Sequence, residues 1–598
     1  MDEKVINFND KAKLAEIYCN VADVCDEKGD YLGELSAFFS ALKVCTRAEE
    51  AEILADIADV YAQMELYELS NRFWFYCIDK KTAAGGDLSE AYSELAANFY
   101  CMDDVWAAGF YLALRAEIQG ALPNREADEE ILNAVYEESN LKTRYWLAYP
   151  FERADYSEAK KRGKRSFAAG GYGAAAAAYE SIPEECRDED SFGELAMAYF
   201  FLKKDEKAIA VSREAIRRLG DNLTAYCNLS TIYGELGDDE KSDYYYGKAL
   251  SLKSGAKDED FKIASCAIER GDHLTARDCL SRALKDRPYD VLLKFFYAIA
   301  LLNLGEYEKA VDVLFECVRI SPDDGIFLWF AELAVKIRAG DKKSVALLPL
   351  KYEKELPHVM AERYEQAFSD ALNGKKTAVP RREILLAAKV AAHLPDEFLA
   401  KTAILTVCEL APKAEAENFL KKTLLNPSVC EEIKSFIIYL LVVHKNKDKT
   451  GIVVGKYYVN VKLRRLPFDE TDEFGAKFIA AYAACVSSLA FTGIEDTDKA
   501  LFALNRLYGE RAEEVRKANL QPNELAAVAV VIAKYEKLNK MKLICQIFGA
   551  KSAKVEKFLN PDAFARSEKP AHASETASSV KTERSGKKNN NENGEEND

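Results

Sequence analysis

The chain has 598 residues, 49 % of them hydrophobic and 30 % charged, and a formal net charge of −17. These proportions are typical of a soluble globular protein, and the longest apolar runs, such as 525–533 and 436–443, have about half the length of a membrane-spanning helix. No apolar run follows Met1 and the 14 cysteines form no Cys-x-x-Cys pair, so we expect a cytoplasmic protein with reduced thiols, no secretory signal and no membrane segment.

The negative charge is concentrated near the amino terminus. Residues 1–150 hold 29 Asp and Glu against 13 Lys and Arg, a net charge of −16, which leaves −1 for the other 448 residues. Such a surface either keeps the protein soluble or attracts a basic peptide or protein. Nucleic acid is an unlikely partner for this half, because phosphate groups carry negative charge as well.

The first 120 residues show a loose repeat of small and aromatic residues at spacings of roughly 36 to 38 residues. Its packing positions include Phe38 and Ala41, then Tyr61, Ser70, Trp74 and Cys77, then Leu95, Ala96, Phe99 and Ala108. We predict a diverged acidic array of helical hairpins over 1–120. An irregular spacer or degenerate hairpin follows over 121–154.

A stricter repeat follows over 155–345. Gly237, Gly271 and Gly305 are separated by 34 residues, and each is followed at fixed distances by small residues. These small residues are Ser242, Ala276 and Ala310 at one position and Ala249, Ala283 and Cys317 at another. A small side chain lets two helix backbones approach closely, and the glycine suits a left-handed helix end.

A 34-residue unit of this form resembles the tetratricopeptide repeat, and the chain is similar to bacterial multi-repeat proteins of that family. The resemblance implies a solenoid of stacked helical hairpins whose first helices line a concave groove. It also implies a role in binding proteins or peptides. The Lys and Asn pattern by which some members grip the carboxyl terminus of heat-shock chaperones is missing, since only Asn228 and Lys262 fall at suitable places.

Beyond 345 the period is lost while the helical pattern persists. We predict degenerate helical hairpins over 346–450, a β-hairpin over 451–466, a helical region over 467–560 and a disordered tail over 561–598. The predicted fold class is therefore all-α, a solenoid of helical hairpins with a helical carboxy-terminal region that contains one small β-hairpin.

The sequence holds few residues with catalytic potential. It has five histidines, and no histidine, cysteine or carboxylate pattern has the spacing of a metal or catalytic site. We predict no enzymatic activity and no cofactor.

An apolar stripe marks a candidate partner-binding surface. In the register that the family implies, two successive first helices present large apolar residues to the groove, namely Phe295, Phe296 and Ile299, then Trp329, Phe330 and Leu333. If the stripe is exposed to solvent, we expect it to bind a partner. Alternatively, the chain itself covers the stripe where the solenoid meets the carboxy-terminal hairpins.

A second candidate lies at 541–559, where the spacing of apolar residues is similar to that of a helix-turn-helix. Residues 534–559 carry seven lysines and two glutamates. Lys551, Lys554 and Lys557 would then contact DNA phosphates. The other interpretation is a helical corner with solvated lysines.

Together these features predict a non-enzymatic adaptor or scaffold that binds a partner protein or peptide, with a basic partner as one alternative. The alternative function is a DNA-associated transcriptional regulator in which the arrays act as sensors.

Overall fold

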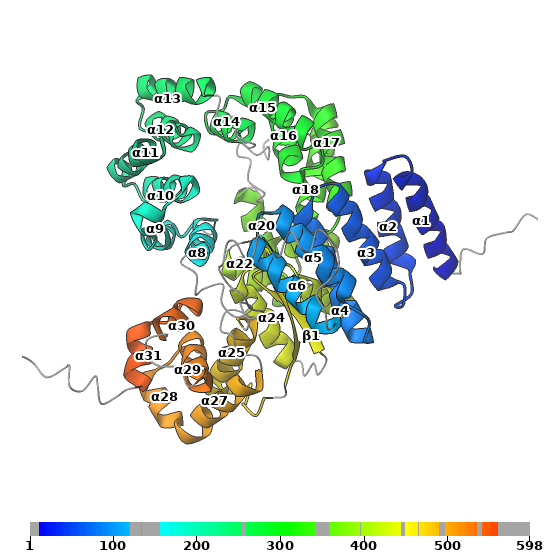
Figure 1. Cartoon of the computed structure of the whole chain (residues 1–598), viewed down its shortest axis with the longest axis vertical. Helices are drawn as coiled ribbons and strands as arrows, with labels where there is room; N and C mark the ends of the chain where they lie inside the picture. Colours follow the sequence, from blue (N-terminus) through cyan, green and yellow to red (C-terminus); the bar gives the residue numbers. More distant parts are fainter. Residues whose placement is uncertain are drawn as a thin grey trace, which may run out of the picture.

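The computed structural model describes residues 11–119, 133, 156–168, 170–252, 259–341, 358–394, 396–443, 449–464, 466–488, 497–534 and 541–559 (Figure 1). The predicted spacer at 121–154, apart from residue 133, and the predicted disordered tail at 561–598 lie outside these residues. Within them the chain forms helical hairpins and one small antiparallel sheet, which confirms the predicted fold class.

Three helical hairpins form the amino-terminal array. They are α1 (Lys11–Asp26) with α2 (Tyr31–Val44), α3 (Glu50–Gln63) with α4 (Tyr67–Ala84), and α5 (Ser89–Cys101) with α6 (Val105–Gln119). The predicted packing residues Ala41, Trp74, Cys77 and Ala108 are all fully buried. The loose repeat therefore marks real packing positions.

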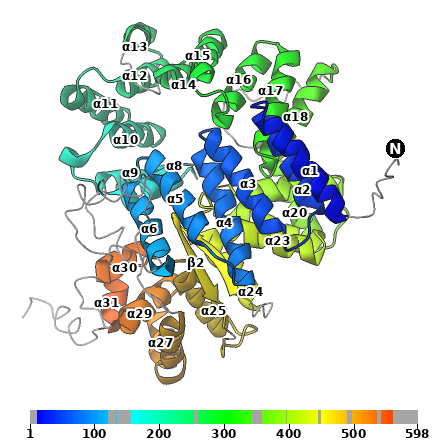
Figure 2. The ribbon, with the colours of Figure 1, turned by 45° about the vertical axis from the view of Figure 1, so that its right-hand side comes forward.

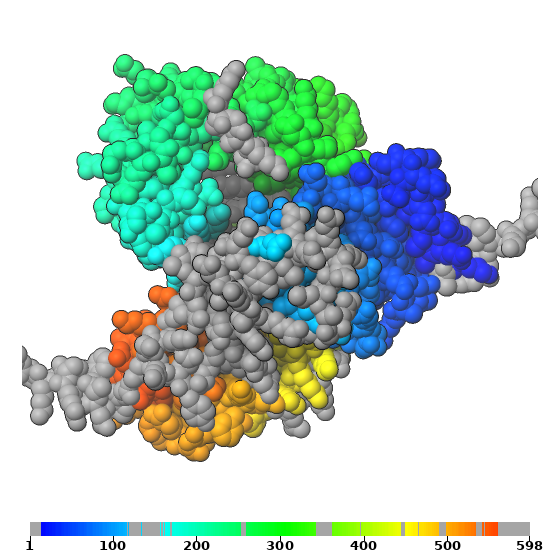
Figure 3. Space-filling model, in the orientation of Figure 1, coloured from blue at the N-terminus to red at the C-terminus, as the bar shows by residue number. Residues whose placement is uncertain are grey.

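A longer series of hairpins follows, and Figure 1 shows it as an arc from α8 to α18. Its elements are α8 (Ser157–Ala168), α9 (Tyr172–Glu180), a 3-10 turn (Glu184–Cys186), α10 (Glu189–Phe201), α11 (Asp205–Leu219), α12 (Leu223–Glu235), α13 (Asp239–Ser251), α14 (Glu259–Glu269), α15 (His273–Asp286), α16 (Val291–Asn303), α17 (Tyr307–Ile320) and α18 (Gly325–Arg338). The space-filling view shows a recess on the inner side of this arc (Figure 3).

The turn between the two helices of each unit explains the glycine period. Gly237, Gly271 and Gly305 have φ angles of 75°, 71° and 79°, a left-handed conformation that costs glycine little. In two of these turns the next residue caps the second helix: Asp238 accepts from the amide of Lys241, and Asp272 from that of Thr275. Each Gly-Asp pair thus ends one helix and begins the next.

The small residues lie where the helices cross, as predicted. Ala276 and Ala310 are completely buried, and so are Ala249 and Cys317. A larger side chain at any of these positions would push two backbones apart.

The carboxy-terminal half begins with α20 (His358–Leu372), α21 (Arg381–Ala391), α22 (Glu397–Leu410), α23 (Lys413–Leu424) and α24 (Glu431–Val443). A hairpin of β1 (Lys449–Val454) and β2 (Tyr457–Lys462) comes next, with Val454 opposite Tyr457 at its turn. The chain then continues through α25 (Glu473–Ser487), α27 (Thr497–Glu510), α28 (Ala512–Ala518), α29 (Pro522–Lys534), α30 (Met541–Ile547) and α31 (Ser552–Leu559). The predicted β-hairpin is therefore present, although it begins two residues earlier than expected.

The amino-terminal array packs against the β-hairpin and against α17 (Figures 1 and 2). The Tyr61 hydroxyl on α3 donates to the carbonyl oxygen of Ile320 at 2.6 Å. The Tyr111 hydroxyl on α6 donates to the carbonyl oxygen of Lys456 at 2.7 Å. One hydrophobic core thus joins segments that are more than 200 residues apart in sequence, a contact for which the sequence offers no signal.

Candidate partner-binding surfaces

The first helices of the regular array bring polar side chains together along three successive hairpins. Lys262 on α14 reaches Glu189 on α10 with 2.6 Å between ammonium and carboxylate, and Thr224 on α12 donates to the same carboxylate. Asn228 donates to the carbonyl oxygen of Gly193 at 3.0 Å. Burial tends to raise the pKa of Glu189, but the hydrogen bonds from Lys262 and Thr224 outweigh it and lower that pKa.

These contacts decide whether the chaperone-type carboxylate clamp is available. Asn228 and Lys262, the two residues at suitable places, already bond to groups of the neighbouring hairpins. A carboxylate ligand would have to displace Glu189 from Lys262.

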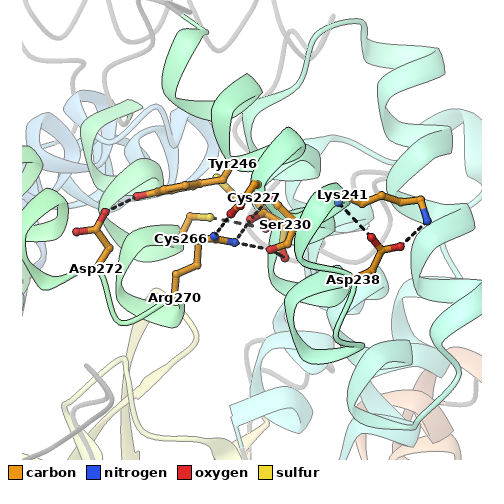
Figure 4. Close-up of polar contacts among 10 residues, drawn as sticks. Cys227, Ser230, Asp238, Lys241, Tyr246, Cys266, Arg270 and Asp272 are labelled. Atoms are coloured by element: carbon orange, nitrogen blue, oxygen red, sulfur yellow. Dashed lines mark hydrogen bonds and ion pairs between the residues drawn. The ribbon is translucent and has the colours of Figure 1, made fainter.

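A second polar cluster fixes α12, α13 and α14 to one another (Figure 4). The Arg270 guanidinium donates to Ser230 at 3.1 Å and to Asp243 at 2.6 Å, and it also donates to Ser242. The ring of Tyr246 lies 4.6 Å from the same guanidinium, measured to the ring centroid. Ser230 and Ser242 lie where two helices approach closely, and their hydroxyl groups accept hydrogen bonds from Arg270. Alanine at these positions would pack but could not accept these bonds. The cluster therefore has a structural role.

The apolar stripe is core in this structure rather than exposed surface. Phe295, Ile299 and Phe330 have no exposed area, Leu333 is 4 % exposed and Trp329 is 8 % exposed. Phe296 is partly buried against Phe261, with 5.8 Å between the two ring centroids. The expectation of an exposed stripe is therefore corrected, because the chain covers these residues.

The cover comes from α20 and α21, the next two helices that the structure describes after α18. The Trp329 indole donates to the Tyr364 hydroxyl at 3.3 Å, and that hydroxyl donates to Glu383 at 2.8 Å. Gly325 at the start of α18 has no side chain, and a methyl group there would meet Leu386 and Val390 at about 3 Å. The apolar residues thus join the solenoid to the helices that follow it.

The lysine-rich element folds as two short helices, α30 and α31, with the left-handed turn at Gly549. Lys551 and Lys557 are exposed, whereas Lys554 is half-buried and lies 2.5 Å from the carboxylate of Glu524. Glu524 is only 4 % exposed in its side chain, so Lys554 neutralises a buried charge. Of the three candidate phosphate contacts, Lys554 therefore has a structural role.

The first helix of each hairpin in the amino-terminal array carries acidic residues. Asp23 lies on α1, Asp56 and Asp59 on α3, and Glu90 and Glu94 on α5. Burial, followed by the charges of Glu52, Asp23 and Glu90, raises the pKa of Asp56 to about 6. Burial, followed by the charges of Glu94, Asp56 and Glu90, raises the pKa of Asp59 to about 7. Neither aspartate forms an ion pair with any residue that the structure describes.

A buried carboxyl group lies on α2, the helix that packs against α1 and α3. Glu34 on α2 is 5 % exposed, and its Oε2 atom has no hydrogen-bond partner among the described residues. Burial, followed by the charges of Asp26, Asp23 and Asp56, raises its pKa to about 7. The sequence indicated the excess of negative charge in this region, but it could not single out these carboxylates, because each looks like an ordinary solvated residue.

The described residues show no metal site and no membrane span. No group of His, Cys, Asp and Glu among them has an arrangement that could hold a metal ion. None of the helices that the structure describes is both long and apolar enough to cross a bilayer.

Comparison with known proteins gives one family. The tetratricopeptide repeat family matches residues 223–255 and 293–324, two units of the regular array. No curated protein sequence matches the chain significantly.

Three solved structures illustrate the range of similar folds. A tetratricopeptide repeat protein from Parabacteroides merdae has 14 % identity over 45 % of this chain and 99 % of its own, with a TM-score of 0.23. Yeast Tom70 has 14 % identity over 85 % of this chain and 99 % of its own, with a TM-score of 0.25. The Cut9–Hcn1 structure of the APC/C has 14 % identity over 84 % of this chain and 90 % of its own, with a TM-score of 0.28. Similarities this weak transfer no function.

The family assignment rests on the two matched units and on the glycine turns and small-residue crossings that the structure shows in the same register. Residues 223–255 and 293–324 are therefore tetratricopeptide repeats within a longer array of helical hairpins.

Proposed function

We propose that the chain is a non-enzymatic adaptor or scaffold that binds a partner protein or peptide through the surfaces of its helical hairpins. The observation that carries the proposal is the repeat architecture, in which successive first helices share one side of a continuous array. Repeat arrays of this kind use extended surfaces for binding rather than a catalytic pocket. A cytoplasmic location is part of the same proposal.

The partner that we propose is basic. Asp56 and Asp59, which form no ion pair with any described residue, lie on the amino-terminal array, and residues 1–150 carry −16 of the net charge of −17. A positively charged partner would be attracted to this array, and exposed charges more than about 10 Å apart are screened near 0.1 M salt.

The DNA-associated alternative has no observation in its favour. Lys554 is bound to Glu524, and the guanidinium of Arg511, the residue just before α28, lies 4.3 Å from the ring centroid of Phe558 on α31. Lys551 and Lys557 alone would leave few phosphate contacts.

Affinity capture with the full chain as bait tests the proposed function. We expect a protein partner that is retained at low salt and released as the salt concentration rises. The same capture after heat denaturation of the bait is the control, because charge alone survives denaturation while the folded surface does not. The absence of any partner specific to the folded bait would contradict the proposal.

A further inference from the structure

We propose that Cys227 and Cys266 form a reversible redox switch, in which a peroxide joins the two thiols as a disulfide and a thiol reductant separates them. Cys227 lies on α12 and Cys266 on α14, the first helices of two successive hairpins. A bond between them would tie these hairpins together. The inference goes beyond the proposed adaptor function and does not depend on it.

The first argument is the reciprocal placement of the two thiols between α12 and α14 (Figure 4). The Cys266 Sγ atom lies 3.8 Å from the carbonyl oxygen of Cys227. The Cys227 Sγ atom lies 3.8 Å from the carbonyl oxygen of Lys262, one helical turn before Cys266. Each sulfur is thus directed at the backbone of the helix that carries the other, and the two thiols also form a hydrogen bond with each other.

The packing of the two helices allows this pair to close. Cys227 is 8 % exposed and Cys266 is 3 % exposed, and both belong to one hydrophobic cluster. A disulfide needs sulfur atoms about 2.0 Å apart and Cα atoms about 4.4–6.8 Å apart. Because α12 and α14 already pack directly against each other, the bond requires side-chain rotation and a small local shift rather than a new arrangement of the hairpins.

The second argument is the difference between the two thiols. The hydrogen bond from the Cys227 thiol and the charge of Arg270 lower the pKa of Cys266 despite its burial. Hydrogen bonds to Ser230 and Asp243 hold the Arg270 guanidinium in place. The contact with Cys266 raises the pKa of Cys227. Cys266 is therefore the thiol that ionises and reacts first, and Cys227 is the thiol that completes the disulfide.

The reaction with hydrogen peroxide balances in two steps. The Cys266 thiolate attacks one peroxide oxygen, the O–O bond breaks, and a sulfenic acid and hydroxide form. The Cys227 sulfur then attacks the Cys266 sulfur, the S–O bond breaks, and the hydroxide that leaves takes up the Cys227 proton as water. Two thiols lose two electrons in total, and one peroxide molecule is reduced to two water molecules.

The disulfide would change the mechanics of the regular array. A repeat array holds together through contacts between neighbouring hairpins, so it can bend wherever two hairpins shift relative to each other. A covalent link between α12 and α14 limits that shift. It also restricts the unfolded chain, so the oxidised protein should melt at a higher temperature than the reduced protein.

The test uses the full chain, first reduced and then treated with hydrogen peroxide, alkylated and digested with trypsin. The tryptic peptides 219–241 and 263–270 hold one cysteine each, Cys227 and Cys266. We expect mass spectrometry to find these two peptides joined, and dithiothreitol to separate them. We also expect the melting temperature of the undigested oxidised chain to rise by several degrees. No joined peptides at a peroxide concentration that oxidises the exposed Cys101 would overturn the inference.

Two variants test the order of the steps. Cys227→Ser removes the second thiol, while the serine hydroxyl group can still donate to the Cys266 sulfur. Dimedone, which reacts with sulfenic acids, should therefore label Cys266 in this variant. In Cys266→Ser, the labelling of Cys227 should be at least tenfold weaker. Equal labelling of the two positions would contradict the roles of the two thiols, and circular dichroism checks that both variants fold.

The matched control is Cys279→Ser on α15, because Cys279 is 3 % exposed and belongs to the same cluster. This variant should form the link between Cys227 and Cys266 as the wild type does. An equal yield of joined peptides from the chain unfolded in urea would show that the thiols pair at random. An unchanged melting temperature after complete oxidation would show that the link does not tie the hairpins. Either result overturns the proposed switch and leaves the adaptor function unaffected.

Discussion

The hydroxyl group of Tyr111 donates a hydrogen bond to the carbonyl oxygen of Lys456 across 2.7 Å. The same hydroxyl accepts a hydrogen bond from the amide of Tyr458 at 3.0 Å. A single side chain of α6 thus satisfies two backbone groups at the tip of the β-hairpin. Lys456 adds an ion pair with Asp104, and the amide of Gly451 bonds to Asp79 at 3.0 Å. These contacts hold the amino-terminal array on the second half of the chain.

We predict that Tyr111→Phe destabilises the protein by about 1–3 kcal/mol, because it leaves two buried backbone groups without their partner. Chemical denaturation measures the change in the free energy of unfolding. Tyr244→Phe is the control, since the Tyr244 side chain is 58 % exposed and should tolerate the change. Equal stability of the two variants would mean that the array is not held through Tyr111.

Ala310→Leu should destabilise the regular array by roughly 1–3 kcal/mol through overpacking, because Ala310 is completely buried at a helix crossing. Asp312→Leu adds the same side chain to an exposed position of the same helix and should have little effect. Thermal unfolding followed by circular dichroism compares the two. A neutral Ala310→Leu variant would contradict the assigned register.

Asp59→Asn should stabilise the protein at pH 8 and have almost no effect at pH 4. The pKa of Asp59 is raised to about 7 in the folded state, whereas an unfolded aspartate titrates near pH 4. The folded chain therefore binds more protons between these values, and its stability falls as the pH rises through this window. We expect a gain of about 1 kcal/mol at pH 8, discounted for the partial exposure of the side chain. Melting curves at the two pH values measure it, and a gain of equal size at both would refute the raised pKa.

Lys554→Ala should destabilise the carboxy-terminal helices by roughly 1–3 kcal/mol, since it leaves the buried Glu524 without its cation. Lys551→Ala, at an exposed position of the same element, should leave the free energy of unfolding unchanged. Urea denaturation of both variants provides the comparison. Retardation of duplex DNA by the wild-type chain at low salt, lost in Lys551→Ala, would instead support DNA binding.

The local structure could be predicted from the sequence, because it depends on neighbouring residues. Gly271 and Ala276 occupy positions at which glycine and a small residue recur in successive repeats, and each position in the repeat has one structural role. Contacts between distant segments could not be predicted in this way. Tyr61 and Tyr111 look like ordinary packing residues of a hairpin, and nothing near them in the chain indicates that Ile320 and Lys456 are their partners.

The candidate surfaces show the same limit. The Trp329 stripe has the composition of a binding surface, and only the position of Tyr364 on another helix shows that it is covered. The acidic region was visible as net charge, yet the unpaired state of Asp59 depends on which cations the fold brings near it. Whether a charged side chain has an ion-pair partner, and whether an apolar side chain is covered, depends on how the whole chain folds.

Hydrogen–deuterium exchange of the full chain, alone and in complex with its captured partner, tests the central claim most directly. The account predicts slower amide exchange in α1, α3 and α5 on binding, and no change in α30 and α31. Protection confined to α30 and α31, or to the inner side of the arc at α10, α12 and α14, would contradict the proposal that the amino-terminal array receives the partner.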